Sequence, residues 1–315
     1  MPLRIIFMGT APLASASLTA LLESREFIVP AVVTQPDRPA GRDLKLQPSS
    51  VKKIALEKNL PVLQPERARD PKFFEQLREL NPDLIVVAAY GQLLPQAILD
   101  LPRFGCINVH ASLLPKYRGA GPIQWAILDD EKETGVTIMK MELGLDSGEM
   151  LSRCATPIKP DDTAQTLHDR LAQIGAQLLP PTLLDYVAGK IVPQKQNETE
   201  VTHARKITKD DGRLDWSQPA RNLWNQVRAF TPWPGAFAFQ KIEATQRLLK
   251  IWQVEVVENF SGEPGKVLLA DKNGIVVACG KNALRIFTLQ KEGGRRMSAA
   301  EFLAGHPMKA GDDFI

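Results

Sequence analysis

Short apolar runs alternate with stretches of helical spacing along the first 189 residues of the chain. The clearest apolar runs are residues 3–8, 27–33, 83–89, 105–110 and 135–141. Leucines recur at helical spacing over 14–23, and a longer helix is predicted over 163–188. Continuous apolar strands with helices between them are typical of a parallel sheet covered on both faces. The pattern therefore predicts an α/β fold with a doubly wound, mostly parallel sheet.

A second pattern begins after the long helix. Residues 190–207 are polar and lack helical periodicity, which predicts an extended linker. Beyond it, glycine-containing turns separate short β-prone runs at residues 249–257, 265–269, 274–279 and 283–289. Several short strands at this spacing predict a small β-sandwich or barrel. A chain of 315 residues also favours two domains. We therefore expect one domain over 1–189 and a second over 208–315.

One connection in the first domain is unusually long. Residues 34–48 separate the second apolar run from the next helix, whereas most such connections have about two to six residues. The segment is rich in proline, glycine and arginine, and it contains Arg38, Arg42 and Lys45. Its length and composition fit either a functional or mobile loop or a plain surface insertion.

Composition is that of an ordinary globular protein, with 44% hydrophobic and 24% charged residues. No apolar run approaches the roughly 20 residues needed to span a bilayer, and no secretory signal is evident. Cys106, Cys154 and Cys279 are far apart and form no C-x-x-C pair, which argues against a disulfide framework and a zinc site. We expect a cytoplasmic protein without membrane contact or metal, and a monomer, because nothing in the sequence demands a dimer.

The charge is distributed unevenly. Residues 1–189 hold 20 Lys and Arg against 22 Asp and Glu, a net charge of −2, whereas residues 190–315 hold 19 against 14, a net charge of +5. A positive second domain would attract a polyanion such as a nucleic acid. Charge scatter of this size also occurs on ordinary solvated surfaces, so this observation leaves both interpretations open.

Two polar residues end one of the predicted strands. Asn108 and His110 are two positions apart, so their side chains lie on the same face of the strand while Val109 points to the other face. Ligands of open parallel sheets bind beyond the carboxyl ends of the strands. Asp146, between glycines 144 and 148, follows another predicted strand and would lie in a loop at this edge. A structural histidine and an ordinary turn aspartate are the alternative interpretation.

An amide, an imidazole and a carboxylate together suit acyl transfer to an amine. Asn108 and His110 can donate hydrogen bonds to the oxyanion of a tetrahedral intermediate, each typically worth about 3–4 kcal/mol. Asp146 can orient His110 and relay a proton from the attacking amine. No serine, cysteine or lysine is visibly paired with a base, which favours direct transfer without a covalent intermediate. Clustered metal-ligand spacing and a dinucleotide-binding fingerprint are both missing from the sequence.

Over nearly its whole length the chain resembles the methionyl-tRNA formyltransferase family. The strongest matches are residues 108–119 (NVHASLLPKYRG) and 135–148 (GVTIMKMELGLDSG). The resemblance places Asn108, His110 and Asp146 at the catalytic positions of folate-dependent formyltransferases. It also implies a Rossmann-like formyltransferase domain followed by an OB-like barrel, and 10-formyltetrahydrofolate as the formyl donor.

The resemblance also implies which residues bind the substrates. Leu113, Leu114, Pro115 and Lys116 would border the folate. Residues 33–42 (VTQPDRPAGR) resemble the basic loop that contacts the acceptor end of tRNA, so Arg38, Arg42 and Lys45 would bind tRNA. Residues 206–212 (KITKDDG) and 228–236 (RAFTPWPGA) resemble the C-terminal segments of this tRNA-using branch.

Three functions are compatible with these features. The first is formyl transfer to initiator methionyl-tRNA by direct attack, with Asn108 and His110 stabilising the oxyanion and Asp146 assisting proton transfer. The second is the same chemistry on a small amine, such as an amino sugar or a purine precursor. The third is a non-catalytic RNA-binding protein on a formyltransferase scaffold; loss of a catalytic residue would favour it, and all three are present. The sequence favours the first.

Overall fold

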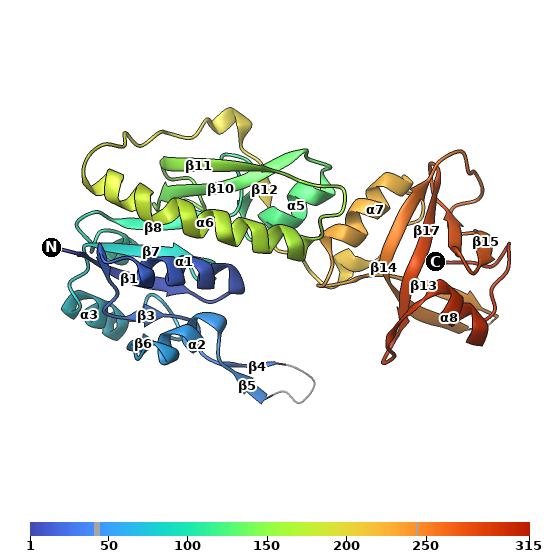
Figure 1. Ribbon diagram of the computed structural model, residues 1–315, viewed down its shortest axis with the longest axis horizontal. Helices are drawn as coiled ribbons and strands as arrows, with labels where there is room; N and C mark the ends of the chain where they lie inside the picture. Colours follow the sequence, from blue (N-terminus) through green and yellow to red (C-terminus); the bar gives the residue numbers. More distant parts are fainter. Residues whose placement is uncertain (41–44, 244) are drawn as a thin grey trace. The chain divides into compact units, whose positions relative to one another are not determined.

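A computed structural model describes residues 1–40, 45–243 and 245–315 of the chain. Its contacts divide it into two compact units. The first unit comprises residues 1–122, 133–157 and 168–204, and the second comprises 123–132, 158–167 and 205–315. Figure 1 shows the helices and strands of both units.

The first unit is built on an eight-stranded sheet with the order β11-β10-β8-β7-β1-β3-β6, in which β2 also pairs with β1. Strands β1, β2, β3, β6, β7 and β8 run parallel, whereas β10 is antiparallel to β8 and to β11. The predicted mostly parallel sheet is confirmed. The strands are β1 (Leu3–Gly9), β2 (Phe27–Ile28), β3 (Val32–Val33), β6 (Val62–Leu63), β7 (Leu84–Ala88), β8 (Cys106–His110), β10 (Glu133–Lys140) and β11 (Met150–Pro157).

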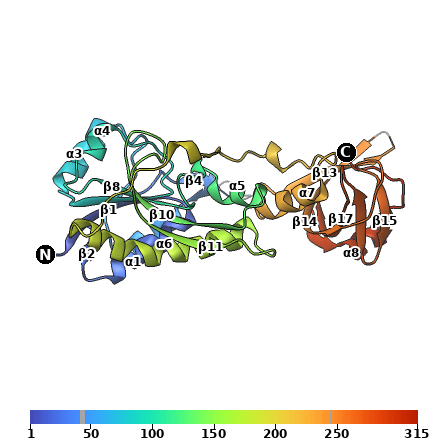
Figure 2. The same cartoon turned by 90° about the horizontal axis from the view of Figure 1, so that it is seen from above.

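Helices cover both faces of this sheet, which explains why its central strands are apolar throughout. Figure 2 shows α1 and α6 on one side and α3 and α4 on the other. Every residue of β7 and β8 is buried as a result. The helices of the first unit are α1 (Pro12–Glu23), α2 (Ser50–Glu57), α3 (Pro71–Glu79), α4 (Gln96–Leu99) and most of α6 (Ala164–Val187), whereas α5 (Pro122–Leu128) falls almost entirely in the segment 123–132 of the second unit.

Two predicted elements differ in detail. The apolar run 27–33 is not one strand: Pro30 falls between β2 and β3, and each short strand pairs with β1 separately. The connection 34–48 contains an antiparallel pair, β4 (Arg38–Ala40) and β5 (Lys45–Gln47), with residues 41–44 outside the described part of the chain (Figure 1). The local pattern gave no period-2 signal in this segment, so the hairpin was not predicted.

The segment expected to be a linker makes specific contacts with the first unit. After the single-turn 3₁₀ helix η1 (Glu198–Glu200), strand β12 (His203–Ala204) pairs in parallel with β9 (Arg118–Gly119). Gln194 forms an isolated antiparallel bridge with Met150 at the start of β11. Residues 194–204 therefore lie on the first unit instead of passing freely away from it.

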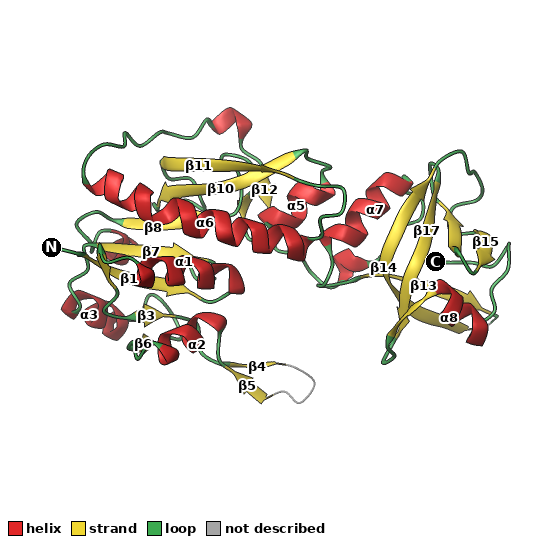
Figure 3. Cartoon of the chain, in the orientation of Figure 1, coloured by secondary structure: helices red, strands yellow, loops and turns green. Residues whose placement is uncertain are grey.

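The second unit contains a curled antiparallel sheet of six strands, seen in yellow in Figure 3. Its order is β13-β14-β17-β16-β15, with β18 paired to β17. Residues 312–315 hydrogen-bond both to β13 and to the start of β15, so they connect the two edges of the sheet. The predicted small barrel is confirmed. The strands are β13 (Ala236–Ile242), β14 (Thr245–Val257), β15 (Val267–Asp271), β16 (Gly274–Ala278), β17 (Ala283–Lys291) and β18 (Arg296–Ser298).

Two helices that the sequence pattern did not reveal complete the core of the second unit. Helix α7 (Ala220–Ala229) buries Leu223 and Val227 against the sheet, and α8 (Ala299–Gly305) buries Phe302. Both are short, so each offers only two or three turns of periodicity. A 3₁₀ turn, η2 (Asp210–Gly212), precedes α7.

None of the helices in the described residues is both long and apolar enough to cross a bilayer.

Candidate active site

Strand β8 carries the first two candidate residues. Asn108 pairs in register with Met139 and His110 with Thr137, both on the antiparallel neighbour β10. Between them, Val109 lies against Gly175 of helix α6, on the opposite face of the sheet. The predicted alternation is therefore present, and Asn108 (9% exposed) and His110 (5% exposed) lie on one face.

The third candidate, Asp146, lies in the loop between β10 and β11. Its backbone has a φ of 50°, a left-handed conformation that non-glycine residues adopt rarely. Its carboxylate accepts a hydrogen bond from Asn108 Nδ2 to Oδ1 (3.3 Å) and one from the Gly119 backbone N–H to Oδ2 (2.8 Å), while His110 Nδ1 lies 3.5 Å from Oδ2. The three side chains that the sequence predicted to converge are thus brought together.

The protonation pattern of His110 follows from its second contact. Its Nε2 lies 2.9 Å from the backbone carbonyl oxygen of Tyr117. A carbonyl oxygen can only accept, so Nε2 carries a proton in this contact and Nδ1 is the nitrogen that faces the Asp146 carboxylate. A ring protonated on both nitrogens satisfies both neighbours at once.

The predicted folate segment follows directly. Leu114 is fully buried against Met139 and Met150, and its N–H donates to Thr137 Oγ1 (3.1 Å). Leu113 is half-buried, Pro115 is buried and follows a cis peptide bond, and Lys116 is exposed. Leu114 therefore anchors the segment on β10 through its buried side chain and its N–H, and Leu113 is the apolar side chain of the segment that remains partly accessible.

The predicted tRNA-binding residues lie at the hairpin of the long connection. Arg38 is exposed on β4, Lys45 belongs to β5, and Arg42 lies outside the described residues. The base of the hairpin is held by Asp37, which pairs with Lys52 Nζ (2.7 Å) and accepts from Gln64 Nε2 (2.9 Å). These hydrogen bonds, chiefly that of Lys52, hold the pKa of Asp37 below its ordinary value.

Other residues around the trio were not found from the sequence. The backbone groups of Tyr117 and Gly119 contact His110 and Asp146, and the buried Gln196 donates to the backbone carbonyl of Asp146 (2.7 Å). Backbone contacts leave no signature in the residue type. Gln196 stands in a polar segment where a glutamine is unremarkable, so only the fold reveals its position.

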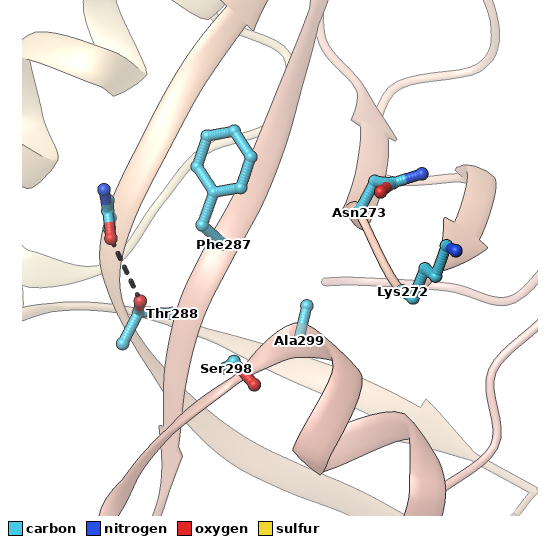
Figure 4. Close-up of a pocket in the computed structure, with 7 residues that line it drawn as sticks. Lys272, Asn273, Phe287, Thr288, Ser298 and Ala299 are labelled. Atoms are coloured by element: carbon cyan, nitrogen blue, oxygen red, sulfur yellow. Dashed lines mark hydrogen bonds between the residues drawn. The ribbon is translucent and has the colours of Figure 1, made fainter.

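The second unit has a cavity of its own, shown in Figure 4, with a volume of about 330 Å³. None of the predicted site residues lines it. Its walls are Gln253, Lys272, Asn273, Phe287, Thr288, Ser298 and Ala299. Among the residues that the structure describes, no group of three or more His, Cys, Asp or Glu side chains is placed to hold a metal ion.

Comparison with known families gives two matches that together cover most of the chain. Residues 3–183 match the formyl transferase family, and residues 206–307 match the formyl transferase C-terminal domain. The segment that carries Gln196 lies between the two matched ranges.

Full-length relatives are similar to the chain along almost all of it. A methionyl-tRNA formyltransferase of Caldanaerobacter subterraneus is 51% identical over 310 residues, which is 98% of this chain and 99% of the relative. One from Geobacter sulfurreducens is 49% identical over 309 residues, covering 98% and 96% of the two chains.

Solved structures share the fold at lower identity. An N-formyltransferase from Helicobacter canadensis, in complex with folinic acid and dTDP-3-aminofucose, superimposes with a TM-score of 0.67 at 19% identity, covering 94% of this chain and all of that one. HypX from Aquifex aeolicus, in complex with tetrahydrofolic acid, gives 0.61 at 18% identity, covering 96% of this chain and 47% of HypX. On its full-length identity to curated relatives and its two family matches, the chain belongs to the methionyl-tRNA formyltransferase family.

Proposed function

We propose that this enzyme transfers the formyl group of 10-formyltetrahydrofolate to the free α-amino group of initiator methionyl-tRNA, giving N-formylmethionyl-tRNA. The observation that carries the proposal is the meeting of Asn108, His110 and Asp146 at the ends of β8 and β10, in a chain about half identical to enzymes of this name. This arrangement suits direct attack of an amine on a formyl carbonyl.

Asn108 and His110 stabilise the oxyanion in this mechanism. The Asn108 amide has two hydrogens, so donation of one to Asp146 leaves the second for the oxygen of the tetrahedral intermediate. For His110 to be the second donor, its Nδ1–H must be shared between Asp146 Oδ2, which lies 3.5 Å away, and the substrate oxygen, because Nε2–H is committed to the Tyr117 carbonyl.

Asp146 assists the proton movement that the reaction requires. The amine nitrogen forms a bond to the formyl carbon and must lose one proton, while the folate nitrogen N10 leaves that carbon and must gain one. The Asp146 carboxylate can accept the first proton, directly or through one water, and return it to N10. No net proton is consumed, and no covalent enzyme intermediate is needed.

The segment Leu113–Lys116 is proposed to border the folate. The half-buried Leu113 can offer apolar surface to a pterin ring. The segment is held against strands β10 and β11, because the Leu114 N–H donates to Thr137 and the Leu114 carbonyl accepts from Arg153 (3.2 Å). Structural neighbours with this fold are described with folinic acid or tetrahydrofolic acid, which supports a folate donor here.

Residues 1–189 are proposed as the catalytic domain and 208–315 as a tRNA-binding domain joined to it by 190–207. In the barrel, Trp252 has Arg296 stacked on its ring (3.5 Å) and Lys250 at 5.9 Å, a combination that suits stacked bases and phosphates. Arg38, Arg42 and Lys45 are proposed to contact the acceptor end. Replacing these three with glutamine should weaken tRNA use and flatten its salt dependence.

The enzyme is proposed to act as a monomer in the cytoplasm, where charged tRNA and reduced folates are found. Buried Cys106 and Cys279 are free thiols, as is the exposed Cys154, in agreement with a reducing compartment. Transfer to a small amine is the rival function. The sugar N-formyltransferases share only the fold at 19% identity, whereas methionyl-tRNA formyltransferases match at about 50% over the full length.

The decisive experiment mixes the enzyme with 10-formyltetrahydrofolate and charged initiator tRNA and quantifies formylmethionine. Single replacement of Asn108, His110 or Asp146 by alanine should lower kcat by roughly 10²–10³-fold, with tRNA affinity changed less than about twofold. Asp185→Ala, at a surface aspartate paired with Lys190, is the matched control and should retain full turnover. Unchanged turnover in all three site variants, or equal turnover with a free amino sugar, would overturn the proposal.

A further inference from the structure

The segment 194–204 crosses the candidate site although neither family match includes it. It reaches the site at two places, at Gln196 and at Thr202–Ala204. At the first place the contacts include Asp146, Gly148 and Arg118, and at the second they include Tyr117, Arg118 and Gly119.

Both the nitrogen and the oxygen of the Gln196 side-chain amide form hydrogen bonds within the first unit. Its Nε2 donates to the backbone carbonyls of Asp146 (2.7 Å) and Gly148 (2.8 Å), and its Oε1 accepts from Arg118 Nε (3.0 Å). The side chain is buried, with Gln196 8% exposed and Arg118 5% exposed. The outer guanidinium nitrogens of Arg118 pair with Glu198 on the same segment, and that hydrogen bond lowers the pKa of the Glu198 carboxyl.

Apart from the contacts of the Asp146 carboxylate and the hydrogen bond from Ser147 to Glu142, the Asp146 loop is weakly packed. Residues 142–145 are exposed, and glycines 144 and 148 flank an aspartate in the left-handed region, so the loop gains little rigidity from burial or from its own sequence. The two hydrogens of the Gln196 amide bind both ends of the turn at once. They therefore fix the direction in which the Asp146 carboxylate points.

The second place of contact fixes the partners of the catalytic side chains. Tyr117 N–H donates to Thr202 Oγ1 (2.9 Å), and Arg118 N–H donates to the Thr202 carbonyl (2.9 Å). The β9–β12 pair then holds Gly119 beside Ala204. The Tyr117 carbonyl accepts from His110, and the Gly119 N–H donates to Asp146. Both contacts therefore depend on the position of the backbone of residues 117–119.

We propose that residues 194–204 form a positioning strap for the active site and that Gln196 is the positioning residue for Asp146. This rests on the proposed function, because it assigns the strap a role in formyl transfer. Gln196 touches no reacting atom; it acts by holding the Asp146 turn, and Arg118 holds Gln196 in the orientation that points its N–H groups at that turn.

The sharpest test is Gln196→Glu in the full-length enzyme. A carboxylate keeps the size and the acceptor for Arg118, but it turns the two donors toward Asp146 and Gly148 into an acceptor. We expect kcat to fall roughly 10–100-fold, the loss typical of a catalytic group displaced by about 1 Å, with KM for donor and tRNA changed less than about twofold. Gln177→Glu makes the same chemical change at an exposed glutamine of helix α6, outside the strap, and should leave kcat unchanged.

Gln196→Met is the second variant, because it removes all hydrogen bonding at nearly constant volume. It should lower kcat by a similar factor in the parent but by less than about threefold in the Asp146→Ala background, since a residue that acts through Asp146 has nothing left to position. The strap is overturned if both Gln196 variants keep kcat within threefold of the parent. It is also overturned if Gln196→Met lowers kcat by the same factor in the Asp146→Ala background as in the parent, or if both variants only unfold. Loss of activity in Asn108→Ala with full activity in both Gln196 variants would contradict only the strap. Full activity in Asn108→Ala, His110→Ala and Asp146→Ala alike would contradict the proposed function itself.

Discussion

The Asp146 carboxylate receives contacts from three residues on two strands of the first unit. Asn108 and His110 reach it from β8, and the Gly119 N–H reaches it from β9. This arrangement leaves one oxygen, Oδ1, shared only with a neutral amide, so the charge of the aspartate is available to an incoming amine.

Asn108→Asp tests the need for a donor at this position. The substitution would place a second carboxylate about where Asn108 Nδ2 now lies 3.3 Å from Asp146 Oδ1, so it both removes the oxyanion donor and sets two like charges side by side. We expect a loss in kcat at least as large as that of Asn108→Ala, roughly 10²–10³-fold, measured with both substrates saturating. An aspartate variant more active than the alanine variant would show that Asn108 is not an oxyanion donor.

The spacing of Asn108 and His110 was sufficient to predict that they share a face, because strand alternation depends only on sequence position. Asp146 could be placed at the same edge because it follows a strand. Gln196 could not be predicted in the same way, since its importance comes from a tertiary contact with a residue 50 positions away.

Short elements position this site as much as the long ones do. The β9–β12 pair consists of only two residues on each strand, and Gly119 within it has a φ of 122°. A Cβ added at Gly119 would lie 2.6 Å from the carbonyl oxygen of Ala204, a separation that only a shift of backbone can relieve. Periodicity cannot reveal a pair this short, whereas β7, β8 and α6 were predicted within one or two residues because each has a long apolar pattern.

Gly119→Ala should therefore lower kcat by roughly 10-fold or more by displacing the Gly119 N–H from Asp146. Gly189→Ala is the matched control: its φ of 70° carries a similar backbone cost, but no atom lies within 4 Å of the added Cβ. Steady-state kinetics on both variants, with thermal melts to compare stability, separates the two effects. Equal kinetics in the two variants would show that the close approach to Ala204 is unimportant.

The turn that leads into the barrel contains a pH-dependent contact. Asp211 accepts from Arg205 Nη1 (2.9 Å) and from the N–H and hydroxyl of Thr208, and these contacts, chiefly that of Arg205, hold its pKa well below the ordinary value of 3.8. A carboxyl with a lowered pKa stabilises the fold above its unfolded pKa and loses that contribution as the pH falls toward the folded one.

Asp211→Asn should lower the melting midpoint at pH 7 by roughly 2–4 °C, a modest effect because Arg205 is 57% exposed. The difference in melting midpoint between parent and variant should become smaller as the pH falls below about 4. Calorimetry across pH 3–7 measures this difference. A difference that is constant over this range would show that the charge of Asp211 contributes nothing to stability.

The two units are not consecutive along the chain, because residues 123–132 and 158–167 belong to the second one. Arg221 pairs with Asp130 (2.7 Å), and Arg228 donates to the backbone carbonyls of Lys159, Pro160 and Asp162. Burial lowers the pKa of Arg228 to about 10. A composition change near residue 190 could indicate where the β-rich part starts, but it could not indicate that earlier segments pack onto α7, since such contacts leave no local pattern.

Two cations flank Trp252 in the second unit. Replacing Lys250 and Arg296, which flank Trp252, with glutamine should weaken tRNA binding and reduce the slope of log affinity against log salt by roughly 0.7–0.9 for each phosphate that the protein no longer neutralises. The KM for the folate donor should stay constant. Lys53→Gln with Lys72→Gln, two exposed cations on α2 and α3, is the equal-charge control. An equal loss of affinity in this control would mean that net charge alone attracts the tRNA.

The hydrogen bond between Tyr117 and Thr202 joins residues 85 positions apart. Closing so long a loop costs conformational entropy that is recovered only after the sheet and helix α6 have formed. On a ribosome, β8 and the Asp146 turn emerge well before the residues that complete them, so a nascent chain acquires its catalytic geometry late. In refolding from denaturant, the far-ultraviolet circular dichroism signal should accordingly return before formylation does.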